Sequence, residues 1–192
     1  MRKLAVVCLA GLIFVTGTYV YSQSAAAPAK TVQKAAAKPA ATDADKIKSA
    51  MSAAPMAIAN GATIMDMPSM KVLKQGTNGW TCFPDTPSPG PDPMCVDKNG
   101  MEWAHAWMTK QAPPKDKLGF AYMLAGGSDA SNTDPFATEP QPGTKWVDTG
   151  PHVMVLNIGD KFAGYPTTPG DTKMPWVMFP NTPYAHLMIP VK

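Results

Sequence analysis

The chain has 192 residues, a formal net charge of +3, 21 prolines and 14 methionines. Its single arginine is Arg2, and without Arg2 and Lys3 the sequence keeps 15 basic and 14 acidic residues. Nucleic-acid binding relies on arginine and lysine contacts to phosphates and bases, and attraction to a membrane surface relies on clusters of basic residues. The composition therefore argues against a nucleic-acid-binding protein and against a polybasic membrane-surface protein.

The first 24 residues have the pattern of a secretory signal peptide. Arg2 and Lys3 precede an apolar run over residues 4–20, and small or polar residues follow it. An uncleaved N-terminal anchor is the alternative, because this run reaches the lower limit of a membrane-spanning helix. Glycine and threonine within the run favour the cleaved signal. The sequence thus predicts an exported protein, periplasmic or secreted, with no stable membrane span after cleavage.

Residues 25–42 are rich in Ala, Lys and Pro and offer little to bury, which predicts a flexible linker. A single globular domain is expected over residues 43–192. If Cys8 leaves with the signal, Cys82 and Cys95 remain, and an even number of cysteines in an exported chain predicts a disulfide. A metal-binding or redox-active pair is the alternative, but the C-x-x-C spacing common in such pairs is absent.

Within the domain the predicted elements are short and bounded by prolines. A helix over residues 43–54, capped by Thr42 or Asp43 and closed by Pro55, comes first, and a second helix is predicted over residues 101–110. Strands are predicted from alternating or continuous apolar residues over 62–67, 70–74, 80–82, 118–125, 152–158, 175–179 and 185–191.

A turn over residues 75–79 makes the strand over 80–82 the returning partner of the strand over 70–74. The strand over residues 118–125 is expected to be buried on both faces, because apolar residues occupy both alternating positions. Prolines at the boundaries favour edge strands and long loops. The predicted fold class is α+β, with a small, mostly antiparallel sheet, two helices and long Pro-rich loops.

Three segments resemble a family of exported bacterial proteins to which no activity is attached. These segments are residues 122–135 (YMLAGGSDASNTDP), 150–154 (GPHVM) and 182–188 (TPYAHLM). The resemblance extends over roughly residues 43–192 and implies export and one compact domain. It assigns no functional residue.

Each histidine is followed by a methionine two or three residues later. The pairs are His105 with Met108, His152 with Met154, and His186 with Met188. Residues two apart on a strand face the same side, and His105 and Met108 share one stripe of the second helix. Because imidazole and thioether together suit copper, above all Cu(I), the six residues form a candidate copper site. The alternative is that the methionines fill an irregular core, as flexible thioethers do.

The polar loop after the strand over residues 118–125 is a second candidate site. It holds four side chains with oxygen atoms, Asp129, Ser131, Asn132 and Asp134. These oxygens could bind Ca²⁺ or a polar ligand, although the EF-hand pattern is absent. The same residue types also form turns for structural reasons.

Signatures of common enzyme classes are missing from the sequence, including the nucleophile elbow, the zinc-protease helix, the P-loop and the dinucleotide fingerprint. A hydrolase using Ser128 or Ser131 with a histidine and an aspartate stays open as an alternative. Trp103 and Trp107 either line a ligand groove or pack the second helix onto the sheet. The sequence favours a non-enzymatic exported accessory or ligand-binding domain, whose partner is a small ligand or another exported protein, with a His/Met copper-binding protein as the alternative.

Overall fold

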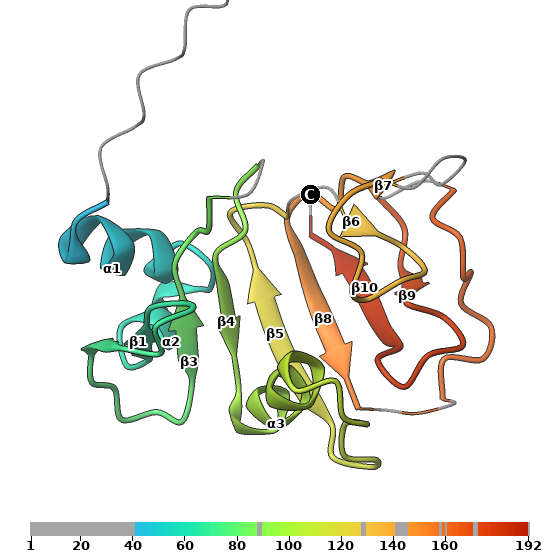
Figure 1. The fold of residues 1–192 in the computed structure, drawn as a ribbon, viewed down its shortest axis with the longest axis horizontal. Helices are drawn as coiled ribbons and strands as arrows, with labels where there is room; N and C mark the ends of the chain where they lie inside the picture. The colour runs from blue at the N-terminus through green and yellow to red at the C-terminus, as the bar shows by residue number, and fades with distance from the viewer. Residues whose placement is uncertain are drawn as a thin grey trace, which may run out of the picture. The chain divides into compact units, whose positions relative to one another are not determined.

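The structure is a computed structural model that describes residues 41–87, 90–127, 130–140, 146–157, 159, 161–170 and 173–191. The predicted signal peptide and nearly all of the predicted linker lie outside these residues. The described residues belong to one compact unit, Pro39–Lys192. Within it, helices and a mostly antiparallel eight-stranded sheet form an α+β fold (Figure 1).

The main sheet has the strand order β2-β1-β3-β4-β5-β8-β10-β9. Its strands are Thr63–Met65 (β1), Val72–Lys74 (β2), Thr81–Phe83 (β3), Met94–Val96 (β4), Gly119–Met123 (β5), His152–Leu156 (β8), Trp176–Met178 (β9) and His186–Pro190 (β10). Neighbouring strands are antiparallel except β1 and β3, which are parallel. Ala130–Ser131 (β6) and Trp146–Val147 (β7) form a separate two-stranded sheet. The α+β class is confirmed, but the prediction of a small sheet is wrong, because this sheet is large and mixed.

Two unpredicted pairings enlarge the sheet. β4 follows the proline-rich segment between the cysteines and pairs with both β3 and β5. The sequence analysis did not predict it, because a three-residue strand next to several prolines has no recognisable pattern. β1 pairs with both β2 and β3, so β3 does not return against β2 as expected. The turn before β3 crosses close to the start of β1, since an added Cβ at Gly76 would overlap the backbone of Ala62 and Thr63.

The two longer helices begin at residues whose side chains accept hydrogen bonds from the first backbone N–H groups. At the start of α1 (Asp43–Met51), the Thr42 side chain accepts from the Asp45 N–H while the Asp45 carboxylate accepts from the Thr42 N–H. Pro55 precedes a further short helix, α2 (Met56–Ala59), so the described residues contain three helices rather than the predicted two. α3 (Lys98–Met108) begins earlier than predicted because Asp97 caps it by accepting from the Gly100 N–H.

The two longer helices pack against opposite faces of the sheet. α1 packs Ala50, with Ile47 and Met51 beside it, against the face that carries Ile64, Cys82 and Cys95. α3 packs Trp103 against the other face, together with core residues of β4, β5, β8, β9 and β10. Neighbouring residues of one strand therefore enter different cores, as the two-residue period of a strand requires. Figure 1 shows α3 crossing the sheet near β4 and β5.

The strand β5 is not buried on both faces as the sequence predicts. Phe120 is 37% exposed on the face opposite α3, whereas Ala121 on the α3 face is fully buried. The main contacts of α1 with the sheet are to β1, β2, β3 and β4, and Phe120 keeps part of its ring in solvent. Apolar residues at alternating positions of a strand therefore do not by themselves show that both faces of the sheet are covered.

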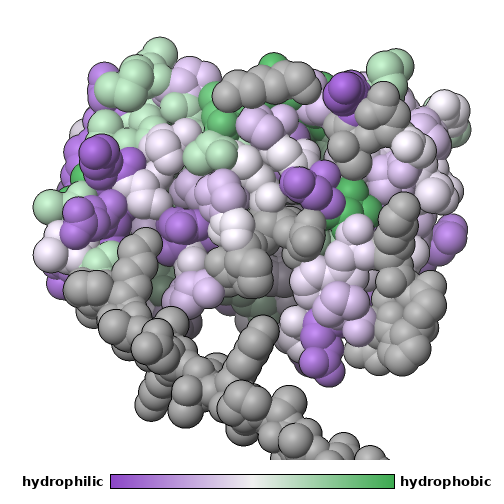
Figure 2. Space-filling model, turned by 90° about the horizontal axis from the view of Figure 1, so that it is seen from above, coloured by the Kyte–Doolittle hydropathy of each residue, from purple (hydrophilic) through white to green (hydrophobic). Residues whose placement is uncertain are grey.

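The predicted disulfide is present between Cys82 and Cys95. It crosslinks directly opposed positions of β3 and β4, with the two Cα atoms 3.9 Å apart. In the described part of the chain, every helix is too short or too polar to cross a membrane. On the face seen in Figure 2, the described side chains are mostly hydrophilic or weakly hydrophobic, and strongly hydrophobic ones are scattered among them.

Candidate functional site

An apolar cavity of about 200 Å³ lies between α3 and the sheet. Its floor comes from six strands, its roof from α3, and its walls from the loops around Met67, Gly127 and Thr149. The described residues that line it are Met67, Phe83, Met94, Trp103, Ala104, Trp107, Met108, Met123, Gly127, Ala130, Thr149, His152, Met154, Met178, Phe179, His186 and Met188. Trp103 and Trp107 thus both line a cavity and pack α3 onto the sheet.

Methionine dominates this lining. Seven of the 14 methionines in the chain line the cavity. An even distribution of methionine along the sequence would place about one among the 17 lining residues. Met154, Met178 and Met188 are buried, whereas Met108 at the end of α3 is 39% exposed. The thioethers therefore extend from the sheet to the protein surface.

Two buried imidazoles share the cavity with these thioethers. His152 and His186 are 1% and 2% exposed. Nδ1 of His152 lies 2.7 Å from the Gly150 carbonyl oxygen, and Nδ1 of His186 lies 3.0 Å from the Tyr184 carbonyl oxygen. Because a carbonyl oxygen can only accept, each Nδ1 carries the proton and donates it. The lone pair of each ring is consequently on Nε2, and Nε2 of His186 is buried without a hydrogen-bond partner among the described residues.

Burial also keeps both rings neutral. It lowers the pKa of His186 to about 4, with the Tyr184 hydrogen bond opposing and repulsion from His152 adding to the decrease. Burial lowers the pKa of His152 as well, against the opposing hydrogen bond to Gly150. At neutral pH both Nε2 atoms are therefore unprotonated, which is the state in which a histidine binds a metal.

The rings are held in place by tight packing. Trp103 and Phe179 lie edge-on to His186, with ring centroids 5.3 Å and 5.4 Å away. At Gly127 an added Cβ would overlap the Thr149 hydroxyl and lie 3.0 Å from Cε1 of His152. The loop can pass the His152 ring at this distance only because residue 127 has no side chain.

The structure brings together five of the six residues of the predicted copper site. Met108, His152, Met154, His186 and Met188 all line the cavity. His105 does not, because it lies on the exposed side of α3 and lines a separate hollow with Met101.

The lining also contains four methionines that the sequence analysis missed. These are Met67, Met94, Met123 and Met178. The described residues contain no group of three or more His, Cys, Asp or Glu side chains placed to hold a metal ion. Any metal in the cavity would therefore depend on the thioethers.

The polar loop has structural roles for its described side chains. The Ser131 hydroxyl accepts from the backbone N–H groups of Thr133 and Asp134. The Asn132 side-chain oxygen accepts from Nε1 of Trp176 at 3.0 Å, and its amide donates to the Thr167 carbonyl. Asp134 accepts from the Phe136 N–H. The bonds of Ser131 and Asp134 are local turn contacts, whereas those of Asn132 connect the loop to β9 and to residue 167. Ser128 and Asp129 lie outside the described residues.

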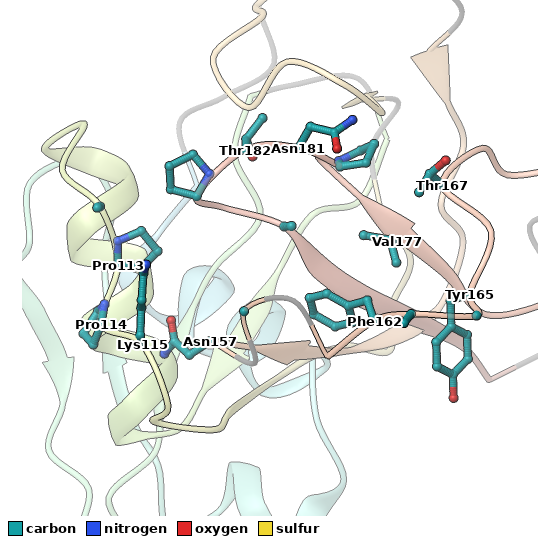
Figure 3. A pocket seen from close by; sticks show the side chains of 17 residues that line it. Pro113, Pro114, Lys115, Asn157, Phe162, Tyr165, Thr167, Val177, Asn181 and Thr182 are labelled. Atoms are coloured by element: carbon teal, nitrogen blue, oxygen red, sulfur yellow. The ribbon is translucent and has the colours of Figure 1, made fainter.

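A larger hollow of about 790 Å³ lies on another part of the surface (Figure 3). Prolines, Phe162 and Tyr165 line it together with Lys115 and Asn157. The Asn157 side-chain oxygen is buried without a hydrogen-bond partner among the described residues. The described lining of this hollow contains no histidine, cysteine, methionine or carboxylate.

Comparisons with known proteins add no relative. No family model, no curated protein and no solved structure matches the chain. The resemblance to exported bacterial proteins stays a prediction, and the function is inferred from the cavity.

Proposed function

We propose that this protein is an exported copper-binding protein that holds Cu(I) in the methionine-lined cavity. One observation carries the proposal: half of the methionines of the chain and two neutral, carbonyl-anchored imidazoles line the same apolar cavity. Soft thioether sulfur favours Cu(I) over harder divalent ions, and imidazole suits copper as well. Nδ1–H donation to a backbone carbonyl is also the usual arrangement of a metal-binding histidine.

The charge of the ligands favours a monovalent ion. Thioethers and neutral imidazoles supply no negative charge, and the described lining contains no carboxylate or thiolate. The cost of moving an ion from water into an apolar site grows with the square of its charge, so a divalent ion pays about four times as much as Cu(I). A cavity with only neutral donors is therefore better suited to Cu(I) than to Zn²⁺ or Cu²⁺.

Export is consistent with the choice of methionine as a ligand. The signal-peptide pattern of residues 1–24 and the Cys82–Cys95 disulfide support an oxidising compartment. Cysteine thiols in such a compartment are readily consumed in disulfides, whereas thioethers stay available as soft ligands. We therefore expect the protein in the periplasm or outside the cell.

A small apolar molecule is the second candidate ligand. The aromatic rings of Phe83, Trp103 and Trp107 in the lining favour it, and it corresponds to the more general expectation of a ligand-binding domain. The two candidate ligands differ in whether they need the methionine sulfur atoms. An apolar molecule would bind about equally well to a cavity in which leucine replaces methionine, whereas Cu(I) would not.

Titration of the mature domain with Cu(I) against a competing chelator tests the proposal. We expect binding tighter than micromolar, and a loss of at least about tenfold in the variant Met154→Leu/Met188→Leu, because leucine keeps the volume but removes two donors. The matched control is Met56→Leu/Met174→Leu, whose methionines are 60% and 63% exposed outside the cavity. Binding weaker than micromolar, or equal losses in both variants, would overturn the proposal.

A further inference from the structure

We infer that the cavity binds two Cu(I) ions, one beside each imidazole, rather than one ion shared by both. This inference rests on the proposed function and specifies the number and position of the ions. It follows from the register of the strands that carry the donors.

Each imidazole has a thioether directly opposite it on a neighbouring strand. His152 of β8 is paired with Met123 of β5, and His186 of β10 is paired with Met178 of β9. Directly opposed residues share one face of the sheet, with Cβ atoms about 5 Å apart. Each histidine therefore has a sulfur donor within reach on a strand that the other histidine does not contact.

Each imidazole also has a thioether two residues along its own strand. Met154 follows His152 on β8, and Met188 follows His186 on β10, on the same face in each case. Met154 and Met188 are paired with each other across β8 and β10. Two similar groups of three donors result, one with His152, Met123 and Met154, the other with His186, Met178 and Met188.

The strand register separates the two imidazoles along the sheet. His152 is opposite Pro190, which lies four residues beyond His186 on β10. At a rise of about 3.3 Å per residue, the backbone positions of the two histidines are about 13 Å apart along the strands. A metal–imidazole bond is about 2 Å long, so a single ion would require the two Nε2 atoms to approach within about 4 Å. In the strand register, Met154 and Met188 lie between the positions of the two histidines, which favours a separate ion beside each histidine.

Two ions in one cavity should repel each other. For unit charges on the order of 10 Å apart at an effective dielectric constant of about 20, the second ion binds roughly tenfold more weakly than the first. Stepwise rather than simultaneous filling is expected.

Counting the bound Cu(I) per wild-type chain under a competing chelator provides the test. We expect two equivalents in the wild type and one equivalent in each of the single variants His152→Leu and His186→Leu. Met123→Leu and Met178→Leu keep the volume of the cavity and should each weaken only one of the two binding steps, so they test the same point without an altered core. Met174→Leu, outside the cavity, should keep both steps unchanged.

The outcomes separate the two proposals. One equivalent in the wild type that is lost in either histidine variant would overturn the two-ion inference and leave the proposed function intact. No tight Cu(I) binding would overturn both. Crystals loaded with Ag(I), a soft monovalent substitute, supply a second measurement: anomalous scattering should show one peak beside His152 and another beside His186, and a single peak between them would contradict the inference.

Discussion

At the scale of single residues, burial of the two histidines lowers the stability of the metal-free protein but leaves Nε2 of His186 available to bind a metal. Each ring gives up solvent contact and keeps one backbone hydrogen bond, through Nδ1. Nε2 of His186 gains no protein partner among the described residues, and a buried polar atom without a partner costs about 1–3 kcal/mol. A metal ion bound at Nε2 would remove that cost, which links the unpartnered nitrogen to the proposed function.

The pKa of His186 predicts how the metal-free protein responds to acid. Its folded-state pKa is about 4 and its ordinary value is 6.5, so the unfolded chain binds a proton at a higher pH than the folded protein does. The free energy of unfolding should therefore fall as the pH decreases from about 6.5 to about 4, by about 3 kcal/mol from this residue. His152, whose pKa is also lowered, acts in the same direction.

Urea unfolding between about pH 7 and pH 4 measures this effect. The variant His186→Leu serves as the comparison, because it removes the titrating group while keeping an apolar side chain. We expect its stability to depend less steeply on pH than that of the wild type. Equal slopes in the two proteins would show that the buried imidazole does not cause the acid sensitivity.

At the scale of secondary structure, the disulfide and the cavity lie on opposite faces of the sheet. The Cys82–Cys95 disulfide lies beneath α1 on one face, while the donors of the cavity lie beneath α3 on the other. Phe83 and Met94, the neighbours of the two cysteines, line the cavity from the same strands. Stability from the disulfide and metal affinity should therefore be largely independent.

Replacement of both cysteines by alanine tests this separation. In the chain-entropy estimate, a loop of this length contributes up to about 3 kcal/mol, and the prolines within it reduce that figure because they already stiffen the unfolded chain. We expect a lower free energy of unfolding with Cu(I) affinity unchanged within about threefold. A loss of copper binding while the variant is still folded would connect the cystine to the metal site and contradict the two-face arrangement.

Elements of this fold that depend on short-range interactions were predictable from the sequence, and those that depend on long-range pairing were not. The start of α1 was predictable because its cap acts within a few residues, whereas the helix ends at Met51, three residues before the predicted end at residue 54. β4 was missed because it is short and follows a run of prolines, and its existence depends on pairing with β3 and β5. The placement of β1 between β2 and β3 was missed for the same reason, since hairpin patterns describe only neighbours in sequence.

At the scale of the whole molecule, the sequence predicted the parts of the candidate site that lie on one element. The pairs His152 with Met154 and His186 with Met188 follow from the two-residue period of a strand, and both line the cavity. Met123 and Met178 could not be placed there, because only the strand register puts them opposite the histidines. His105 has a similar sequence pattern but lies on the exposed side of α3, which no local pattern could distinguish.

The central claim is that sulfur and imidazole nitrogen from this cavity bind Cu(I). Copper-edge X-ray absorption of the Cu(I)-loaded protein, produced with selenomethionine in place of methionine, tests it most directly because selenium neighbours of copper are readily distinguished from lighter atoms. The account predicts selenium together with nitrogen in the first coordination shell, and a loss of selenium neighbours in the variant Met154→Leu/Met188→Leu. A shell of only nitrogen and oxygen atoms would contradict it.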